Sequence, residues 1–127
     1  MELVAIVTAL VLIQYLWFTI LVGRAREKSG IKAPLTTGDT LFECYYRVQQ
    51  NTAEQLILFI PALWIFGYYV NPSVAAGLGV VFIVGRFVYL RGYITDPAKR
   101  GPGFLIGMLA VLALVIGSLV GPIIDWL

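Results

Sequence analysis

Long apolar stretches constrain this chain most, because a soluble domain could not bury them. Two of them, Leu3 to Gly23 and Phe104 to Ile124, each supply on their own the roughly 20 residues that a membrane-spanning helix needs. Two shorter stretches, Leu56 to Val70 and Val74 to Gly85, must include polar neighbours to reach that length. Hydrophobic residues make up 60% of the chain, which excludes an ordinary soluble composition. The sequence therefore predicts an all-α membrane protein.

Helix breakers between the apolar stretches predict four helices. Gly30 and Pro34 follow the first helix, Asn71-Pro72 opens the third, and Asp96-Pro97 ends it. The first stretch lacks a basic leader and a small-residue cleavage site, so we interpret it as a retained helix and not as a signal peptide. We expect one domain, residues 1–127, forming a four-transmembrane-helix bundle with helices at about 3–26, 41–70, 72–95 and 103–124.

Local signals indicate how the helices begin, bend and pack. Thr40-Leu-Phe-Glu43 has the pattern of a capping box, which predicts Thr40 as the N-cap of the second helix. Pro61 predicts a kink within that helix. In the fourth helix, Gly103-x-x-x-Gly107 and Gly117-x-x-x-Gly121 allow close helix packing, which we expect to occur within the chain.

A polar block interrupts the apolar pattern at the start of the second helix. Its spacing places four polar residues on one helical face: Glu43, Arg47, Asn51 and Glu54. At a rise of 1.5 Å per residue from the outer turn, Glu54 lies about 24 Å deep and Arg86 about 21 Å. Ionisable groups at such depth are costly and usually line a pathway or a site. Their opposite charges and similar depth predict an ion pair between Glu54 and Arg86.

The remaining arginines outnumber the acids near them. Arg26, Arg47 and Arg100 have no obvious deep acid, and a surplus of guanidinium groups indicates a ligand that carries carboxylate or phosphate. Polar residues can also simply hold a helix bundle together, but the number at matching depths favours a site. It would take a small charged molecule from the cytosol and an apolar substrate from the bilayer. Neutral hydrogen-bonding groups come from Gln49, Asn51, Tyr89 and Tyr93.

Charge and residue types also set orientation and exclude some functions. The nine basic residues lie toward the first and third loops, so the positive-inside rule places these loops in the cytosol and both termini outside.

The chain has no histidine and one cysteine, Cys44, which excludes histidine-dependent metal sites and catalytic pairs, and we expect no metal. A nucleic-acid partner is not expected without a binding motif. A small transporter is a further alternative, but no broken helix or repeat supports it.

These residues also carry a family resemblance. The chain reads Leu35-Thr-Thr-Gly38, Glu43-x-x-x-Arg47-x-Gln49-x-Asn51-x-x-Glu54, Gly85-Arg86-x-x-Tyr89-x-x-Gly92-Tyr93 and Lys99-Arg100. This pattern resembles the MAPEG family, the membrane-associated proteins in eicosanoid and glutathione metabolism, and is most similar to its microsomal glutathione transferase and leukotriene C synthase branch. The resemblance implies a homotrimer in a bacterial inner membrane or a microsomal membrane. Glutathione would bind between neighbouring subunits near the cytosolic face.

The resemblance further implies roles for single residues. Arg100 matches the arginine that stabilises the glutathione thiolate, so it would be catalytic. That thiolate would attack an apolar electrophile or reduce a lipid hydroperoxide. Gln55, where relatives carry an aromatic residue, and Glu27, where the synthase branch carries a second arginine, favour a general transferase or peroxidase over leukotriene synthesis. The alternative is a non-catalytic lipid-binding scaffold. Glutathione would be bound by Arg26, Arg47, Gln49, Asn51, Glu54, Arg86, Tyr89 and Tyr93.

Overall fold

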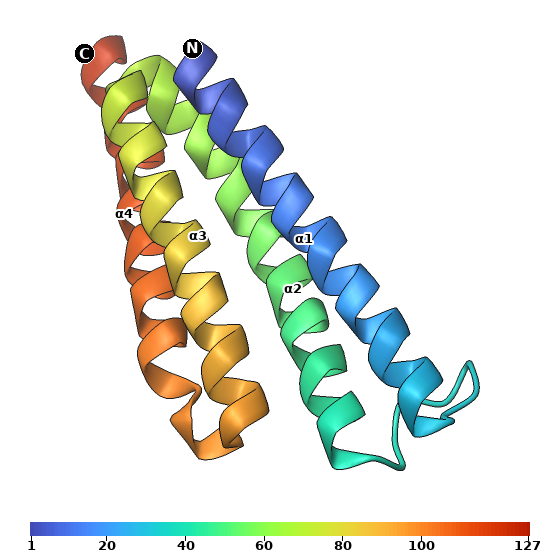
Figure 1. The fold of residues 1–127 in the computed structure, drawn as a ribbon. Helices are drawn as coiled ribbons and strands as arrows, with labels where there is room; N and C mark the ends of the chain where they lie inside the picture. Colours follow the sequence, from blue (N-terminus) through green and yellow to red (C-terminus); the bar gives the residue numbers. More distant parts are fainter.

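Four long helices make up the protein, as the sequence predicts. The structure is a computed structural model and describes residues 1–127. The helices run up and down side by side, so both termini and the α2–α3 turn lie at one end, and the other two connections lie at the opposite end (Figure 1). The elements are α1 (Glu2–Ser29), α2 (Thr40–Tyr69), α3 (Pro72–Thr95), the short 3-10 helix η1 (Pro97–Lys99) and α4 (Gly101–Trp126).

The helices have the length and the outer surface that a bilayer requires. Three segments are long and apolar enough to cross a membrane: Glu2–Ser29, Pro72–Thr95 and Pro97–Trp126. α2 does not meet that criterion, because the polar block interrupts its apolar part. Its 30 residues nevertheless extend about 45 Å, and it packs alongside α1, α3 and α4. All four helices therefore form one transmembrane bundle.

The start of α2 differs by one residue from the predicted start. Asp39, and not Thr40, is the N-cap, since its Oδ1 accepts a hydrogen bond from the Phe42 N–H at 2.9 Å. Both residue types cap helices well, so the sequence pattern leaves the choice between adjacent positions open. Asn71 caps α3 as predicted, with its Oδ1 accepting from the Val74 N–H at 3.0 Å.

The other helices extend beyond their predicted limits. α1 continues to Ser29 and stops at Gly30, whose φ of 77° lies in the left-handed region that glycine adopts without strain. α4 begins at Gly101, two residues before its predicted start. The short helix η1, which ends at Lys99, was not predicted from the sequence.

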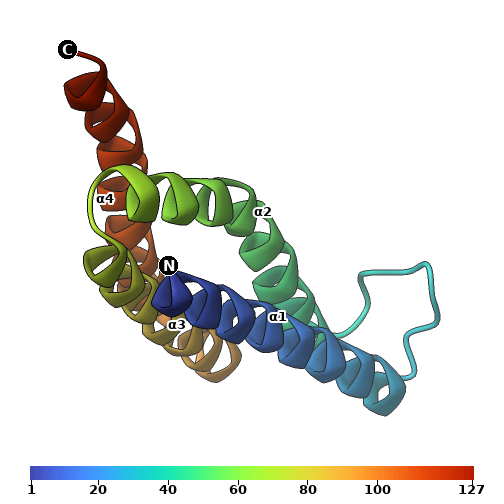
Figure 2. The same cartoon turned by 90° about the horizontal axis from the view of Figure 1, so that it is seen from above.

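α2 bends partway along its length (Figure 2), and Pro61, which cannot donate a backbone hydrogen bond, lies inside it.

Glycines allow α3 and α4 to approach closely. A methyl group added at Gly85 of α3 would lie 2.6 Å from the backbone nitrogen of Gly107 on α4. A methyl group at Gly103 would overlap the backbone of Tyr89. Gly117 packs in the same way against a side chain of α2. Both glycine motifs of α4 therefore pack within the chain, as predicted.

The apolar core fills the half of the bundle that holds the termini. All four helices contribute to it, and the rings of Phe59 and Phe82 stack with their centroids 4.1 Å apart. Toward the other end the α1–α2 pair and the α3–α4 pair splay apart (Figure 1), and the buried apolar contact between them is reduced to a small cluster of Phe18, Val48 and Tyr89. The polar block lies at this more open end.

Candidate functional site

A cleft of about 460 Å³ opens where α2 and the α3–α4 pair separate. Five of the residues predicted for the site line it, so the fold brings together side chains from three helices. The remaining two lining residues, Gly101 and Phe104, belong to the first turn of α4. The predicted residues in the lining are Arg47 and Asn51 of α2, Tyr89 and Tyr93 of α3, and Arg100 just before α4.

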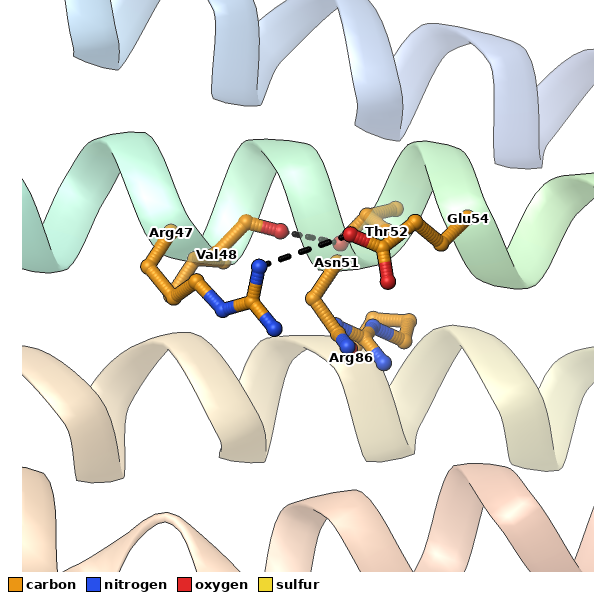
Figure 3. Close-up of polar contacts among 6 residues, drawn as sticks. All are labelled: Arg47, Val48, Asn51, Thr52, Glu54 and Arg86. Carbon is orange, nitrogen blue, oxygen red and sulfur yellow. Dashed lines mark hydrogen bonds and ion pairs between the residues drawn. The ribbon is translucent and has the colours of Figure 1, made fainter. Parts of the chain in front are cut away.

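Arg86 lies beneath the cleft and is the only buried charged side chain, with 1% of its surface exposed. Its Nη2 donates a hydrogen bond to Asn51 Oδ1 at 2.9 Å (Figure 3). Its guanidinium carbon lies 4.2 Å from the centroid of the Tyr89 ring, a cation–π contact. Its Nε has no hydrogen-bond partner, and no carboxylate lies within ion-pair distance. The base of the cleft thus holds a positive charge that no acid of this chain neutralises.

The ion pair predicted between Glu54 and Arg86 is not present, and that prediction was wrong. Glu54 Oε1 instead accepts from Arg47 Nη1 at 3.4 Å, along one face of α2 (Figure 3). Residues seven apart lie two turns apart on the same helical face. The depth calculation placed each charged residue along the membrane normal, but it did not show toward which neighbouring helix its side chain points. Asn51, and not Glu54, faces Arg86.

Arg100 lies at the mouth of the cleft and is exposed. Its guanidinium carbon is 5.7 Å from the centroid of the Tyr93 ring, and its Nη1 donates to the Pro97 carbonyl at 2.8 Å. The short helix η1 supplies that carbonyl, so the turn between α3 and α4 positions the side chain. An arginine has five N–H donors, and the others of Arg100 have no acceptor within the chain.

Two predicted site residues lie away from the cleft within this single chain. Gln49 Nε2 donates to Thr19 Oγ1 of α1 at 3.0 Å. Arg26 Nη1 donates to the Leu35 carbonyl at 2.7 Å, and its guanidinium carbon lies 4.7 Å from the centroid of the Phe42 ring. Both residues therefore belong to the α1–α2 side of the molecule.

Sequence reasoning did not select two residues of the cleft. Gly101 adjoins Arg100, and the helix-opening run Gly101-Pro102-Gly103 was the signal that could have found it. Phe104 contributes an apolar wall, with its ring centroid 6.1 Å from that of Tyr89. A phenylalanine at the start of an apolar helix carries no signal of its own.

The residues present suit a small molecule that carries both charges. The arginines can bind carboxylates, Glu54 can bind an ammonium group, and the tyrosine hydroxyls and the Asn51 amide can donate further hydrogen bonds. Phe104 offers an apolar surface beside them. Nowhere in the chain do three or more His, Cys, Asp or Glu side chains gather as metal ligands could.

Fold and site together define a polytopic helical membrane protein with an arginine-rich cleft at one end of its bundle. Residues 4–120 match the MAPEG family, and the chain belongs to that family. It is 48% identical over 115 residues to an uncharacterized protein of Synechocystis, covering 91% of this chain and 84% of that protein. The predicted family resemblance is confirmed, and the chain is an integral membrane protein.

Two further relatives have named activities. Human microsomal glutathione S-transferase 2 is 41% identical over 115 residues, which cover 89% of this chain and 78% of that protein. Leukotriene C4 synthase of Cavia porcellus is 40% identical over 98 residues, which cover 77% of this chain and 65% of that protein.

Proposed function

We propose that this protein is an integral membrane glutathione transferase whose glutathione thiolate attacks apolar electrophiles or reduces lipid hydroperoxides. Its family and the names of its relatives support a glutathione-dependent membrane activity in general. The observation that carries the specific proposal is the excess of arginine at the cleft. Arg47 and Arg100 line the cleft, and Arg86 lies beneath it, bonded to the lining residue Asn51. Glu54 is the one acid that forms an ion pair with any of these arginines. Glutathione has two carboxylates, one ammonium group and a thiol, so its charges complement this set.

Binding of glutathione would rearrange the ion pair at the cleft. Both members of the Arg47–Glu54 pair are more than half exposed, so separating them costs about 1 kcal/mol or less. Arg47 then binds a carboxylate, and Glu54 binds the ammonium group. Asn51 keeps its amide NH₂ free while its oxygen accepts from Arg86. Tyr89 and Tyr93 complete the hydrogen bonds around the peptide.

Arg100 would activate the thiol. A free thiol has a pKa near 8.5, and a neighbouring guanidinium lowers that value because it stabilises the thiolate. Arginine suits this role since it stays charged at all physiological pH values. The thiol proton passes to water, and the sulfur forms a bond to the electrophilic carbon while the leaving group departs with its electron pair. Phe104 and the adjoining helix surfaces would hold the apolar substrate.

The two residues outside the cleft support a shared site in a homotrimer. Arg26 and Gln49 lie on the α1–α2 side of each subunit, so they would reach the cleft of a neighbouring subunit. The end of the bundle that carries the cleft also carries the basic connections, so the positive-inside rule predicts that this end faces the cytosol. Glutathione would therefore enter from the cytosol and the electrophile from the bilayer.

Turnover by purified, detergent-solubilised protein tests the catalytic role. Conjugation of glutathione to an aryl halide, or reduction of a lipid hydroperoxide, should occur. Arg100→Ala should lower turnover at least about tenfold, which corresponds to about one unit in the thiol pKa, while glutathione affinity changes less. The thiolate absorbance of the bound complex should fall in parallel. Lys99→Ala is the matched control and should leave turnover unchanged.

Two outcomes would contradict this proposal. Full activity and undiminished thiolate in Arg100→Ala would move the activating role to another arginine, with Arg26 the next to test. Glutathione binding by the unmodified protein without turnover of any electrophile would favour the non-catalytic lipid-binding scaffold.

A further inference from the structure

A second cavity, of about 320 Å³, lies between the end of α1 and the start of α2. It shares no residue with the arginine-rich cleft. Its lining combines two cationic side chains with apolar and aromatic walls. The residues that matter here are Arg24 and Lys28 of α1 on the polar side, and Leu21, Leu41 and Tyr45 on the apolar side.

The two basic residues of this cavity are free to bind an anion. Arg24 and Lys28 are four residues apart and share one face of α1. Neither forms an ion pair, since the chain's two ion pairs are elsewhere. Asp39, the one acid in the lining, uses its carboxylate to cap α2. Glu27 lies with Arg24 and Lys28 around a neighbouring surface hollow, but it does not line this cavity and forms no ion pair with either basic residue.

The depth of the cavity matches the phosphate level of a bilayer. Arg24 lies about 32 Å along α1 from Leu3, and the hydrocarbon core is about 30 Å thick. The Arg24 guanidinium carbon lies 5.3 Å from the centroid of the Trp17 ring, so the cation rests on an aromatic side chain of the type common at the membrane interface. Trp17 and Leu21 continue the cavity toward the hydrocarbon as an apolar surface.

We propose that this cavity binds an anionic phospholipid, with the lipid phosphate on Arg24 and Lys28 and the upper acyl chain against Leu21 and Trp17. Basic pockets between helices at the membrane surface are suited to such headgroups. The two basic residues lie about 200° around α1 from Arg26, so they occupy a different face of the helix from that proposed subunit contact. The cavity and Arg26 meet at Phe42, which lines the cavity and contacts the Arg26 guanidinium. The proposed lipid site is independent of what the arginine-rich cleft binds.

Native mass spectrometry of the delipidated, detergent-solubilised full chain can measure this binding. Phosphatidylglycerol should bind more tightly than phosphatidylcholine. Arg24→Gln combined with Lys28→Gln should weaken phosphatidylglycerol binding about 30-fold, since two basic contacts are removed. The matched control, Lys32→Gln combined with Arg91→Gln, removes the same charge from the same end of the bundle and should change binding by about twofold or less. Arg24→Lys keeps the charge and should retain binding.

Several results would overturn the proposal. Equal losses in both double variants would show a general basic surface and no defined site. Undiminished binding in the Arg24/Lys28 double variant would show that these two charges do not hold the lipid. Loss of binding in Arg24→Lys would show that charge at this position is not what binds it. Displacement of the lipid by inorganic phosphate alone would identify a soluble anion as the ligand.

Discussion

At the scale of single residues, Arg86 links the stability of the bundle to its proposed function. Its guanidinium is buried in the membrane-spanning part of α3, with one hydrogen bond from Nη2 and an unpartnered Nε. Burial of a charge is unfavourable unless hydrogen bonds and opposite charge compensate. Asn51 and Tyr89 provide part of that compensation, and a bound carboxylate would provide more. Ligand binding should therefore also stabilise the fold.

Asn51→Ala should lower the melting temperature of the protein in detergent. The change leaves Arg86 Nη2 without its partner, at a cost of about 1–3 kcal/mol. Circular dichroism at increasing temperature would measure the loss. Gln50→Ala, on the same helix turn but without a side-chain hydrogen bond, should melt close to the unmodified protein. Equal melting temperatures for the unmodified protein, Asn51→Ala and Gln50→Ala would mean that the Arg86–Asn51 hydrogen bond contributes little to stability.

The sequence predicts which residues form the site better than it predicts their partners. Spacing and depth are enough to place Arg47, Asn51 and Tyr89 near one another. They are not enough to choose between Asn51 and Glu54 as the partner of Arg86, because the choice depends on how α2 is rotated against α3. That rotation follows from packing along the whole length of both helices. No local pattern encodes it.

At the scale of elements, the contact between α3 and α4 holds the cleft in shape. Gly103 of α4 lies against the backbone of Tyr89, and Gly92 of α3 lies against the Lys99 carbonyl of η1. α3 therefore meets both α4 and the turn before it backbone to backbone. Such contacts, which only glycine permits at this distance, are a common way to join transmembrane helices. They fix Tyr89 and Arg100 relative to each other across the cleft.

Gly85→Ala should destabilise the bundle, because the added methyl group would lie 2.6 Å from the Gly107 nitrogen. Forcing extra volume into a packed contact costs about 1–3 kcal/mol. Gly77→Ala in the same helix is the control, since a methyl group there meets nothing within 4 Å. Thermal melting in detergent should separate the two variants. If Gly85→Ala melts no lower than Gly77→Ala, close packing at Gly85 is not required.

The sequence predicts a helix boundary correctly where only one position carries a capping signal. Asn71-Pro72 sets the start of α3 without ambiguity. At the start of α2 two adjacent capping residues compete, and Asp39 is used in place of Thr40. The short helix η1 has no apolar periodicity, so its only sequence signal is Pro97, its first residue, which ends α3 as predicted.

At the scale of the whole molecule, the bundle has one closed end and one open end. The apolar core joins all four helices near the termini, whereas the basic end opens into the arginine-rich cleft. The fold class follows from the apolar stretches alone. The division into two ends does not, because the splay of the helix pairs depends on long-range contacts and on the bend in α2.

Thiol labelling should establish which end faces the cytosol. In a Cys44→Ala background, Ser73→Cys probes the α2–α3 turn and Lys32→Cys probes the α1–α2 connection, and both positions are exposed. A membrane-impermeant thiol reagent should label Ser73→Cys on intact cells. It should label Lys32→Cys only after the membrane is permeabilised. The reverse pattern would place the cleft on the outer side and contradict entry of glutathione from the cytosol.

The central claim is that the arginine-rich cleft binds glutathione, and isothermal titration calorimetry of the purified protein in detergent tests it most directly. The unmodified protein should bind glutathione with measurable heat. Arg47→Ala should bind at least about tenfold more weakly, the loss of roughly 1.4 kcal/mol for one charge-assisted contact. Lys32→Ala, which removes an exposed charge outside the cleft, should bind as the unmodified protein does. Equal affinities for all three proteins, or no binding by the unmodified protein, would contradict the account.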